Sequence, residues 1–314
     1  MELSGAVAAF LATKPDSGDP DAPVAVRRAA IHHGSDQLFD KFGAPATPVG
    51  VTNFAVGRPG GDIRVRVYRP ETERRLPLYV FLHGGGFWLG SIDEKVNEAM
   101  CHDRSGRAEC VVVAVDYRLA PEHPFPVPLE DCFAGLSWAV EHAAEIGADP
   151  RRVAVGGISA GANLAAAVTL LARARGGPRI DFQLLEVPPL DLTLATMRGS
   201  GITDDYGITV GDMRLCGDLY LGPGPDRHDP LVSPLYAEDL TGLPPARIMS
   251  AEHDPLRLDG ERYAQRLRES GVPVSFEIYP GAVHGSLALT GTWPPAATWH
   301  QDVVSALSRL RTAA

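Results

Sequence analysis

The sequence predicts an α/β fold in which a mostly parallel sheet is covered by helices on both faces. Short apolar runs typical of buried strands alternate along the chain with helix-like segments. One such run, 152–155, leads into a glycine-flanked serine and then an alanine-rich stretch at 162–172. The chain has 314 residues, of which 45% are hydrophobic, so it can bury a large core.

The predicted elements follow in a simple order. Residues 1–45 read as helices and loops, and the apolar residues Ile31, Leu38, Phe39 and Phe42 recur at helical spacing within 25–42. Alternating residues at 51–56 and 63–68 predict paired edge strands. Further strands are predicted at 78–82, 109–115, 153–155, 182–185, 246–250 and 274–279, and helices at 129–144, 162–172, 260–269 and 298–310.

Residues 190–235 interrupt this alternation. The segment contains a predicted helix at 211–221 and a Gly/Pro-rich loop at 222–225. So long an excursion between strands is usually a lid or a binding segment. We therefore expect it to lie near a ligand.

The strongest functional signal is the segment Gly157-Ile158-Ser159-Ala160-Gly161 between a predicted strand and a predicted helix. A serine on a sharp strand-to-helix turn is the nucleophile elbow of an α/β-hydrolase. Glycines flank it because the turn leaves no room for side chains. The turn would also place Ser159 at a helix N-terminus, which favours developing negative charge.

A second signal, His83-Gly84-Gly85-Gly86-Phe87, follows the apolar run 78–82 directly. Successive glycines let the backbone approach a ligand and turn its N–H groups inward. Loops of this type supply oxyanion-hole donors in lipases and esterases. Together with the N–H of Ala160, they would stabilise the oxyanion of a tetrahedral intermediate.

The order Ser, acid, His required by this fold selects two further residues. Asp254 follows the strand predicted at 246–250, and His284 follows the strand predicted at 274–279. His284 would take the proton of Ser159, and Asp254 would orient the imidazole. Competing candidates are Asp259 for the acid and His253 or His300 for the base.

The composition bears on several function classes. A formal net charge of −10 disfavours nucleic-acid binding. The four cysteines form no C-x-x-C pair and no zinc-like spacing with histidine, so we expect no metal and no cofactor. No apolar run approaches the roughly 18 residues of a membrane span, and no basic segment opens a signal peptide. We therefore expect a cytoplasmic protein that does not bind membranes.

These motifs resemble those of the bacterial hormone-sensitive-lipase-like esterases, an α/β-hydrolase family. The resemblance runs from about residue 60 to the C-terminus and includes 83–87, 116–126, the elbow with Asn163-Leu164, 254–257 and 284–285. It implies that Gly85, Gly86 and Ala160 form the oxyanion hole, and that His83 orients the glycine loop. It also implies a helical cap, which divides the chain into cap helices at 1–45, a core at 46–189 and 236–314, and a second cap segment at 190–235.

The sequence departs from the family pattern near the site. Ile158 stands where an acid usually precedes the serine, Ala162 replaces a common glycine, and Ser286 replaces an aromatic. Four residues are candidates for substrate binding: Phe87, Trp88, Glu186 and Tyr206. Arg118 and Glu122 are expected to form a buried pair that braces the floor of the site.

The predicted function is hydrolysis of carboxylic esters with short- to medium-chain acyl or aryl groups, through an acyl-enzyme. The departures keep a second hypothesis open, in which the scaffold hydrolyses or transfers one specialised acyl, lactone, amide or carbamate substrate. A third hypothesis, a non-hydrolytic ligand-binding relative or a dehydratase, fits less well because Ser159, Asp254 and His284 are all present. The resemblance also implies a homodimer that pairs through an edge strand.

Overall fold

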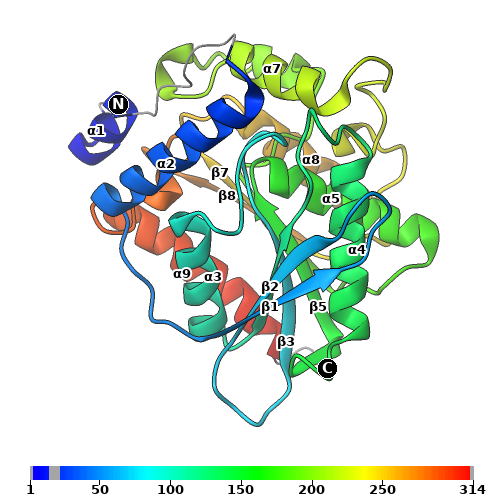
Figure 1. Ribbon diagram of the computed structural model, residues 1–314. Coiled ribbons are helices and arrows are strands. Elements are labelled where there is room, and N and C mark those ends of the chain that lie inside the picture. The colour runs from blue at the N-terminus through cyan, green and yellow to red at the C-terminus, as the bar shows by residue number, and fades with distance from the viewer. Residues whose placement is uncertain (1–2, 14–21, 312–314) are drawn as a thin grey trace.

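The architecture is built on a single eight-stranded sheet with strand order β1-β2-β4-β3-β5-β6-β7-β8 (Figure 1). The structure is a computed structural model that describes residues 3–13 and 22–311. Strands β3 to β8 run parallel to one another. At one edge β2 pairs antiparallel with β4, and β1 pairs antiparallel with β2. The strands are β1 (Gly50–Val56), β2 (Ile63–Arg69), β3 (Leu76–Leu82), β4 (Val111–Asp116), β5 (Ala148–Ile158), β6 (Phe182–Glu186), β7 (Ala246–Ala251) and β8 (Val274–Tyr279).

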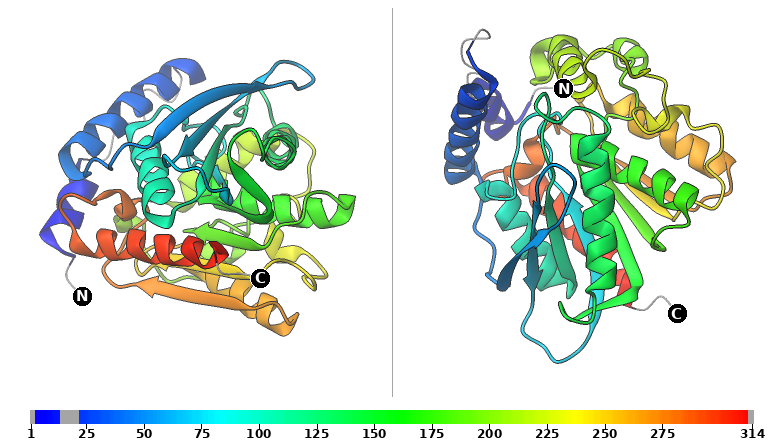
Figure 2. Two further views of the ribbon diagram at one scale, coloured as in Figure 1. Left: turned by 90° about the horizontal axis from the view of Figure 1, so that it is seen from below. Right: turned by 45° about the vertical axis from the view of Figure 1, so that its right-hand side comes forward.

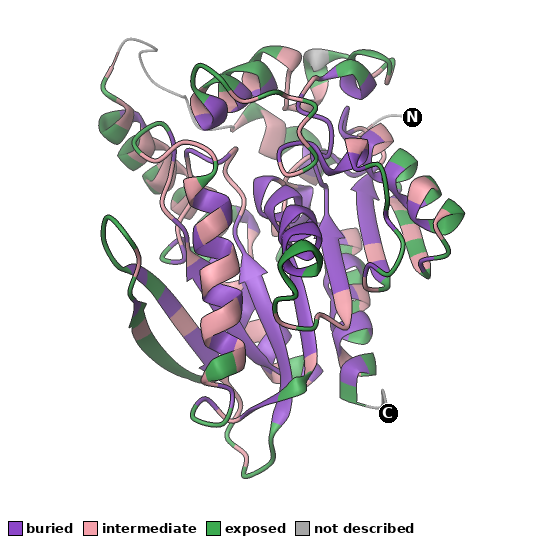
Figure 3. Ribbon diagram, turned by 90° about the vertical axis from the view of Figure 1, so that its right-hand side faces the viewer, coloured by how far each residue is buried: buried purple, intermediate pink, exposed green. Residues whose placement is uncertain are grey.

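Helices cover both faces of this sheet, and the central strands between them are buried (Figures 2 and 3). Alternate strand residues explain this: Val80 packs towards α4, α5 and α8, while Phe81 packs towards α3 and α9. Both strand faces are therefore apolar, as expected for a covered parallel sheet. The helices are α1 (Gly5–Ala12), α2 (Val24–Phe42), α3 (Lys95–Ala108), α4 (Val127–Glu141), α5 (Ala160–Arg175), α6 (Ala195–Arg198), α7 (Val210–Leu221), α8 (Arg257–Glu269) and α9 (Pro294–Ser308).

Helix α2 packs across the loop that follows β3. Arg28 donates hydrogen bonds to the carbonyl oxygens of Trp88 and Ala120 at 2.8 and 3.0 Å, and its guanidinium pairs with Glu122. The apolar side of α2 is only half-buried, because Ile31, Leu38 and Phe39 line a cavity instead of filling the core. The helix thus forms one wall of the site described below.

The predicted fold class is confirmed, and most predicted elements agree with the structure to within a few residues at their ends. Helix α3 was not predicted, because its polar residues, including buried Asn97 and Arg104, hide the apolar pattern. The predicted pair of Arg118 and Glu122 is wrong. Arg118 instead binds the buried carboxylate of Asp131, at 2.7 Å, and Glu122 binds Arg28. Within the described residues, no helix has the length and apolar character needed to cross a bilayer.

Candidate active site

The serine of the predicted elbow lies at the junction of β5 and α5. Ser159 has φ 53° and ψ −120°, which places this non-glycine residue in a sparsely populated backbone conformation. Its N–H donates to the carbonyl oxygen of Glu186 on β6 at 2.8 Å, which fixes the turn. A Cβ at Gly157 or Gly161 would lie 2.4 or 2.1 Å from the carbonyl oxygen of Leu82. Only glycine therefore allows β3 to approach the turn this closely.

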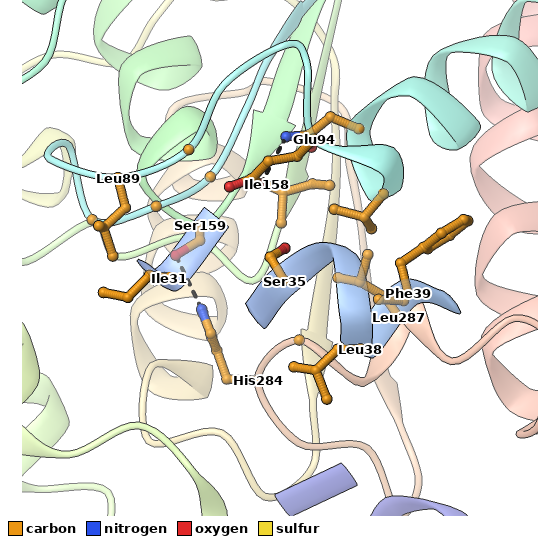
Figure 4. A pocket seen from close by; sticks show the side chains of 18 of the residues that line it. Ile31, Ser35, Leu38, Phe39, Leu89, Glu94, Ile158, Ser159, His284 and Leu287 are labelled. Atoms are coloured by element: carbon orange, nitrogen blue, oxygen red, sulfur yellow. Dashed lines mark hydrogen bonds between the residues drawn. The ribbon is translucent and has the colours of Figure 1, made fainter. Parts of the chain in front are cut away.

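Three side chains from the ends of β5, β7 and β8 form one hydrogen-bonded chain. His284 Nε2 lies 3.0 Å from Ser159 Oγ, and its Nδ1 lies 2.7 Å from Asp254 Oδ2 (Figure 4 shows the first contact). Asp254 is buried, and its second oxygen accepts the N–H of Leu256 at 2.9 Å. The arrangement suits proton transfer from the serine to the imidazole, with the carboxylate holding the tautomer that carries its proton on Nδ1.

The loops that carry the acid and the base are tied to each other. His253, next to Asp254, donates its N–H to the carbonyl oxygen of Ala282 at 2.9 Å, two residues before His284. The side chain of Glu252 accepts the N–H of Gly281 at 2.7 Å. These bonds fix the separation of the two loops, so the distance between Asp254 and His284 does not depend on the two side chains alone.

The glycine loop after β3 takes a conformation that other residues rarely adopt. Gly85 and Gly86 have φ values of 118° and 59°. A Cβ at Gly85 would lie 2.2 Å from the carbonyl oxygen of Leu89, which is backbone and cannot give way easily. Within the described residues, the N–H groups of Gly85 and Gly86 make no hydrogen bond. They are therefore free to bind an oxyanion, and the first N–H of α5, at Ala160, lacks an intrahelical partner.

His83 lies beneath this loop. Its Nδ1 lies 2.8 Å from the carbonyl oxygen of Gly84, and its ring stacks on Tyr117 with 4.2 Å between the ring centroids. The hydroxyl of Tyr117 donates to the carbonyl oxygen of His83 at 2.8 Å. Burial lowers the pKa of His83, so the ring is neutral near pH 7 and donates from Nδ1. These contacts hold the glycine loop, as the family resemblance implies.

A cavity of about 380 Å³ opens beside Ser159 and His284. Helices α1, α2 and α7 contribute several of the side chains that line it. The lining is predominantly apolar, and its main side chains are Phe10, Ile31, Leu38, Phe39, Phe42, Leu89, Val96, Met100, Ile158, Ile208, Met213, Cys216, Leu287 and Leu289. The helical spacing of Ile31, Leu38, Phe39 and Phe42 had indicated a buried helix face, whereas the structure places these residues in the wall of the cavity.

The residues predicted to bind substrate lie elsewhere. Phe87 has φ 69° and turns inward to stack on Tyr220, with 4.0 Å between the ring centroids. Trp88 is buried under α2, with the guanidinium of Arg27 over its ring at 4.9 Å. Tyr206 stacks on His253 at 4.7 Å. None of the three belongs to the described lining of the cavity, because each ring packs against another part of the chain.

Glu186 also points away from the cavity. Its carboxylate is fully buried, 2.7 Å from Arg104, and accepts the indole N–H of Trp299 at 2.8 Å. The strand end is on the expected edge, but alternation along β6 directs this side chain into the layer of α3 and α9. Glu186 therefore acts as a structural brace and not as a substrate contact.

The competing candidates for the acid and the base are held in other contacts. Asp259, whose pKa burial raises to about 7, accepts the N–H groups of Leu190 and Asp191 at 2.7 and 2.9 Å. The buried His300 lies with its Nε2 2.9 Å from the carbonyl oxygen of Leu287. His253 forms the stacking contact already described. The geometry therefore favours Asp254 and His284.

Comparison with known proteins bears on the fold and the family of the chain. A family model described as an alpha/beta hydrolase fold matches residues 79–288. The carboxylic ester hydrolase LipN of Mycobacterium tuberculosis is 42% identical over 276 residues, which cover 86% of this chain and 73% of that protein. An arylesterase of Saccharolobus solfataricus is 41% identical over 249 residues, which cover 77% of this chain and 79% of that protein.

Solved structures give the same result across the whole chain. A hyperthermophilic esterase from the archaeon Pyrobaculum calidifontis superimposes with a TM-score of 0.91 at 34% sequence identity, and the match covers 100% of both chains. The similarity thus includes the helices that surround the cavity as well as the sheet.

Proposed function

Because the chain belongs to the α/β-hydrolase fold family as a serine ester hydrolase, we propose that Ser159, His284 and Asp254 carry out the hydrolysis. The observation that carries the proposal is the continuous hydrogen-bonded chain from Ser159 Oγ through His284 to Asp254, with distances of 3.0 and 2.7 Å. This chain ends in the cavity, where an ester can reach the serine.

The reaction then runs in two steps. Ser159 Oγ attacks the ester carbonyl carbon while His284 Nε2 accepts the hydroxyl proton, and the carbonyl oxygen becomes an oxyanion. The imidazolium gives that proton to the departing alkoxide, which leaves an acyl-enzyme and an alcohol. A water molecule, deprotonated in turn by His284, attacks the acyl carbon. Collapse of this second intermediate releases the carboxylic acid and restores Ser159.

The oxyanion hole in this proposal consists of the N–H groups of Gly85, Gly86 and Ala160. Its support is that Gly85 and Gly86 have left-handed backbone angles and make no hydrogen bond among the described residues. Preorganised donors of this kind stabilise charge that develops during the reaction, and loss of one typically costs a factor of about 10² to 10³ in kcat.

The substrates in this proposal are esters with short- to medium-chain acyl or aryl groups. A cavity of about 380 Å³ with mostly apolar walls suits groups of this size. Segments 1–45 and 190–235 serve as the cap, since α1, α2 and α7 supply much of the lining. We place the enzyme in the cytoplasm.

Labelling with a fluorophosphonate tests the proposal. We expect one adduct per chain, mapped to Ser159, because phosphonylation needs an activated serine and an oxyanion hole. A panel of p-nitrophenyl esters should show turnover of several short acyl groups. Adducts on another residue, or none in a folded sample, would refute the assignment. Turnover of a single member of the panel would favour the specialised hydrolase or acyltransferase.

The proposal also includes a homodimer that pairs through β8. This strand ends the sheet order and bonds only to β7 among the described strands, so its outer N–H and C=O groups can pair with a second copy. We expect a dimer in sedimentation velocity experiments, and Ile278→Pro should shift it to monomer, because the N–H of Ile278 points away from β7. A wild-type monomer at micromolar concentration would contradict this part of the proposal.

A further inference from the structure

The cavity contains a carboxylate that the hydrolysis proposed above does not use. Glu94 lies in the lining together with Ser159 and His284, and only 8% of the residue is exposed. Figure 4 draws it with Ile158 and Ser159 around the same cavity. Of the described residues that line this cavity, Glu94 alone is acidic.

The side chain makes no capping hydrogen bond to the backbone of its own helix. Glu94 is the N-cap residue of α3, a position where a carboxylate usually accepts a backbone N–H from the first turn. No such bond forms here. The carboxylate lines the cavity instead, and its potential for accepting hydrogen bonds remains largely unused.

Few groups compensate the charge of Glu94. One oxygen accepts a hydrogen bond of 3.3 Å from the side-chain amide of Asn97, which also donates to the carbonyl oxygen of Ser91 at 2.8 Å. No ion pair of Glu94 is formed within the described part of the chain. Its neighbour Asp93, in contrast, pairs with both Arg64 and Arg66 at 2.6 Å.

This situation is unfavourable for an ionised carboxylate without a ligand. Burial, and secondly the negative charge of Asp36 on α2, raise the pKa of Glu94 to about 7. At neutral pH roughly half of the molecules therefore carry the charge. A cation entering the cavity would relieve the cost of burying that charge.

We propose that Glu94 binds an ammonium group on one arm of the ester substrate, so that the enzyme favours esters of amino acids or of amino alcohols. The inference rests on the proposed function, because the ester has to lie at Ser159 while its cationic end reaches Glu94. The apolar lining would hold the methylene chain between the two ends.

The other charged groups around Glu94 are already engaged. On α3, Lys95 binds Asp40 of α2 at 2.6 Å, and Glu98 binds Arg66 of β2 at 2.7 Å. On α2, Asp36 accepts the N–H of Lys95, and its other oxygen lies 3.7 Å from His32. His83, beneath the glycine loop, is neutral. Together these groups leave a negative local charge, with no protein cation bound to Glu94 in the described structure.

Matched pairs of esters test the inference. The p-nitrophenyl esters of 6-aminohexanoic and heptanoic acids have acyl chains of equal length and differ in an ammonium against a methyl end. The acetates of 6-aminohexanol and heptanol make the same comparison in the alcohol arm. The readout is the ratio of kcat/KM for the ammonium ester to kcat/KM for the neutral ester. We expect Glu94→Gln to lower this ratio by about 10- to 100-fold in one of the two series.

The pH dependence gives a second readout. In the wild type the ratio should rise as pH increases through about 7, since Glu94 becomes ionised while the amine stays protonated. Any ionisation that affects both esters alike cancels in the ratio. In Glu94→Gln the ratio should not vary with pH over this range.

Glu98→Gln is the control, because it removes the same charge from the same helix outside the cavity. An equal ratio in the wild type and Glu94→Gln, in both series, would overturn the inference, and so would an equal fall in Glu98→Gln. The p-nitrophenyl ester of 6-hydroxyhexanoic acid has a neutral polar end. If Glu94→Gln still prefers this ester to the heptanoic ester, that preference would also count against the inference. If no neutral ester is hydrolysed and Ser159 is not labelled, it is the proposed function that fails.

Discussion

Replacing Ser159 by alanine is expected to lower kcat by roughly 10⁴- to 10⁶-fold. The substitution removes the hydroxyl that lies 3.0 Å from His284 Nε2 and leaves no other nucleophile in the chain of hydrogen bonds. Initial rates with a p-nitrophenyl ester would measure the loss. The residual rate reports what the oxyanion hole and substrate binding achieve without the serine.

Stability should hardly change in this variant. Alanine keeps the Cβ in the strained backbone at φ 53°, and the N–H bond to Glu186 remains. Ser137→Ala, on α4 and away from the cavity, is a control for loss of a serine hydroxyl. Activity above about a hundredth of the wild type in Ser159→Ala would mean that another residue is the nucleophile.

Replacing Arg104 by methionine should destabilise the protein by about 3–5 kcal/mol. Arg104 and Glu186 are both fully buried, and the substitution would leave the carboxylate of Glu186 without its cation. The remaining bond from Trp299 cannot compensate a full charge. Denaturant unfolding at pH 7 would measure the change in free energy.

A double variant separates the missing cation from the altered packing. In Arg104→Met with Glu186→Leu the buried charge is absent, so we expect most of the lost stability to return. Arg107→Met, on the same helix but exposed, should cost less than about 1 kcal/mol. If the double variant is no more stable than Arg104→Met, packing and not charge explains the loss.

The sequence was sufficient, for a local reason, to predict the sheet and to select three side chains, those of Ser159, His284 and Asp254, that the structure brings together. Strand ends, glycine turns and the order of Ser159, Asp254 and His284 are all encoded in short segments. The elbow, for example, needs glycine at 157 and 161 because β3 passes close to both. The sequence shows this requirement as two glycines, each two residues from Ser159. Such features do not require knowledge of distant contacts.

The walls of the cavity could not be predicted in the same way. Phe87, Trp88, Glu186 and Tyr206 are close to reacting residues in sequence or at the expected edge, yet each side chain turns towards another layer. Glu94 was not singled out because α3 was not predicted and an acidic residue in a polar segment is usually exposed. Its burial depends on the packing of α2, which local sequence does not reveal.

The origin of the cavity walls has a consequence for how this enzyme can diverge. The side chains of the proposed triad stand on strand ends that the sheet fixes, whereas α1, α2 and α7 supply part of the cavity lining from segments outside the sheet. Ile31 and Leu38, for example, are half-buried residues of α2 that line the cavity at a distance in sequence from Ser159, Asp254 and His284. Part of the cavity lining is thus encoded in stretches of the gene that do not encode Ser159, Asp254 or His284, and selection can change those stretches while these three residues are preserved.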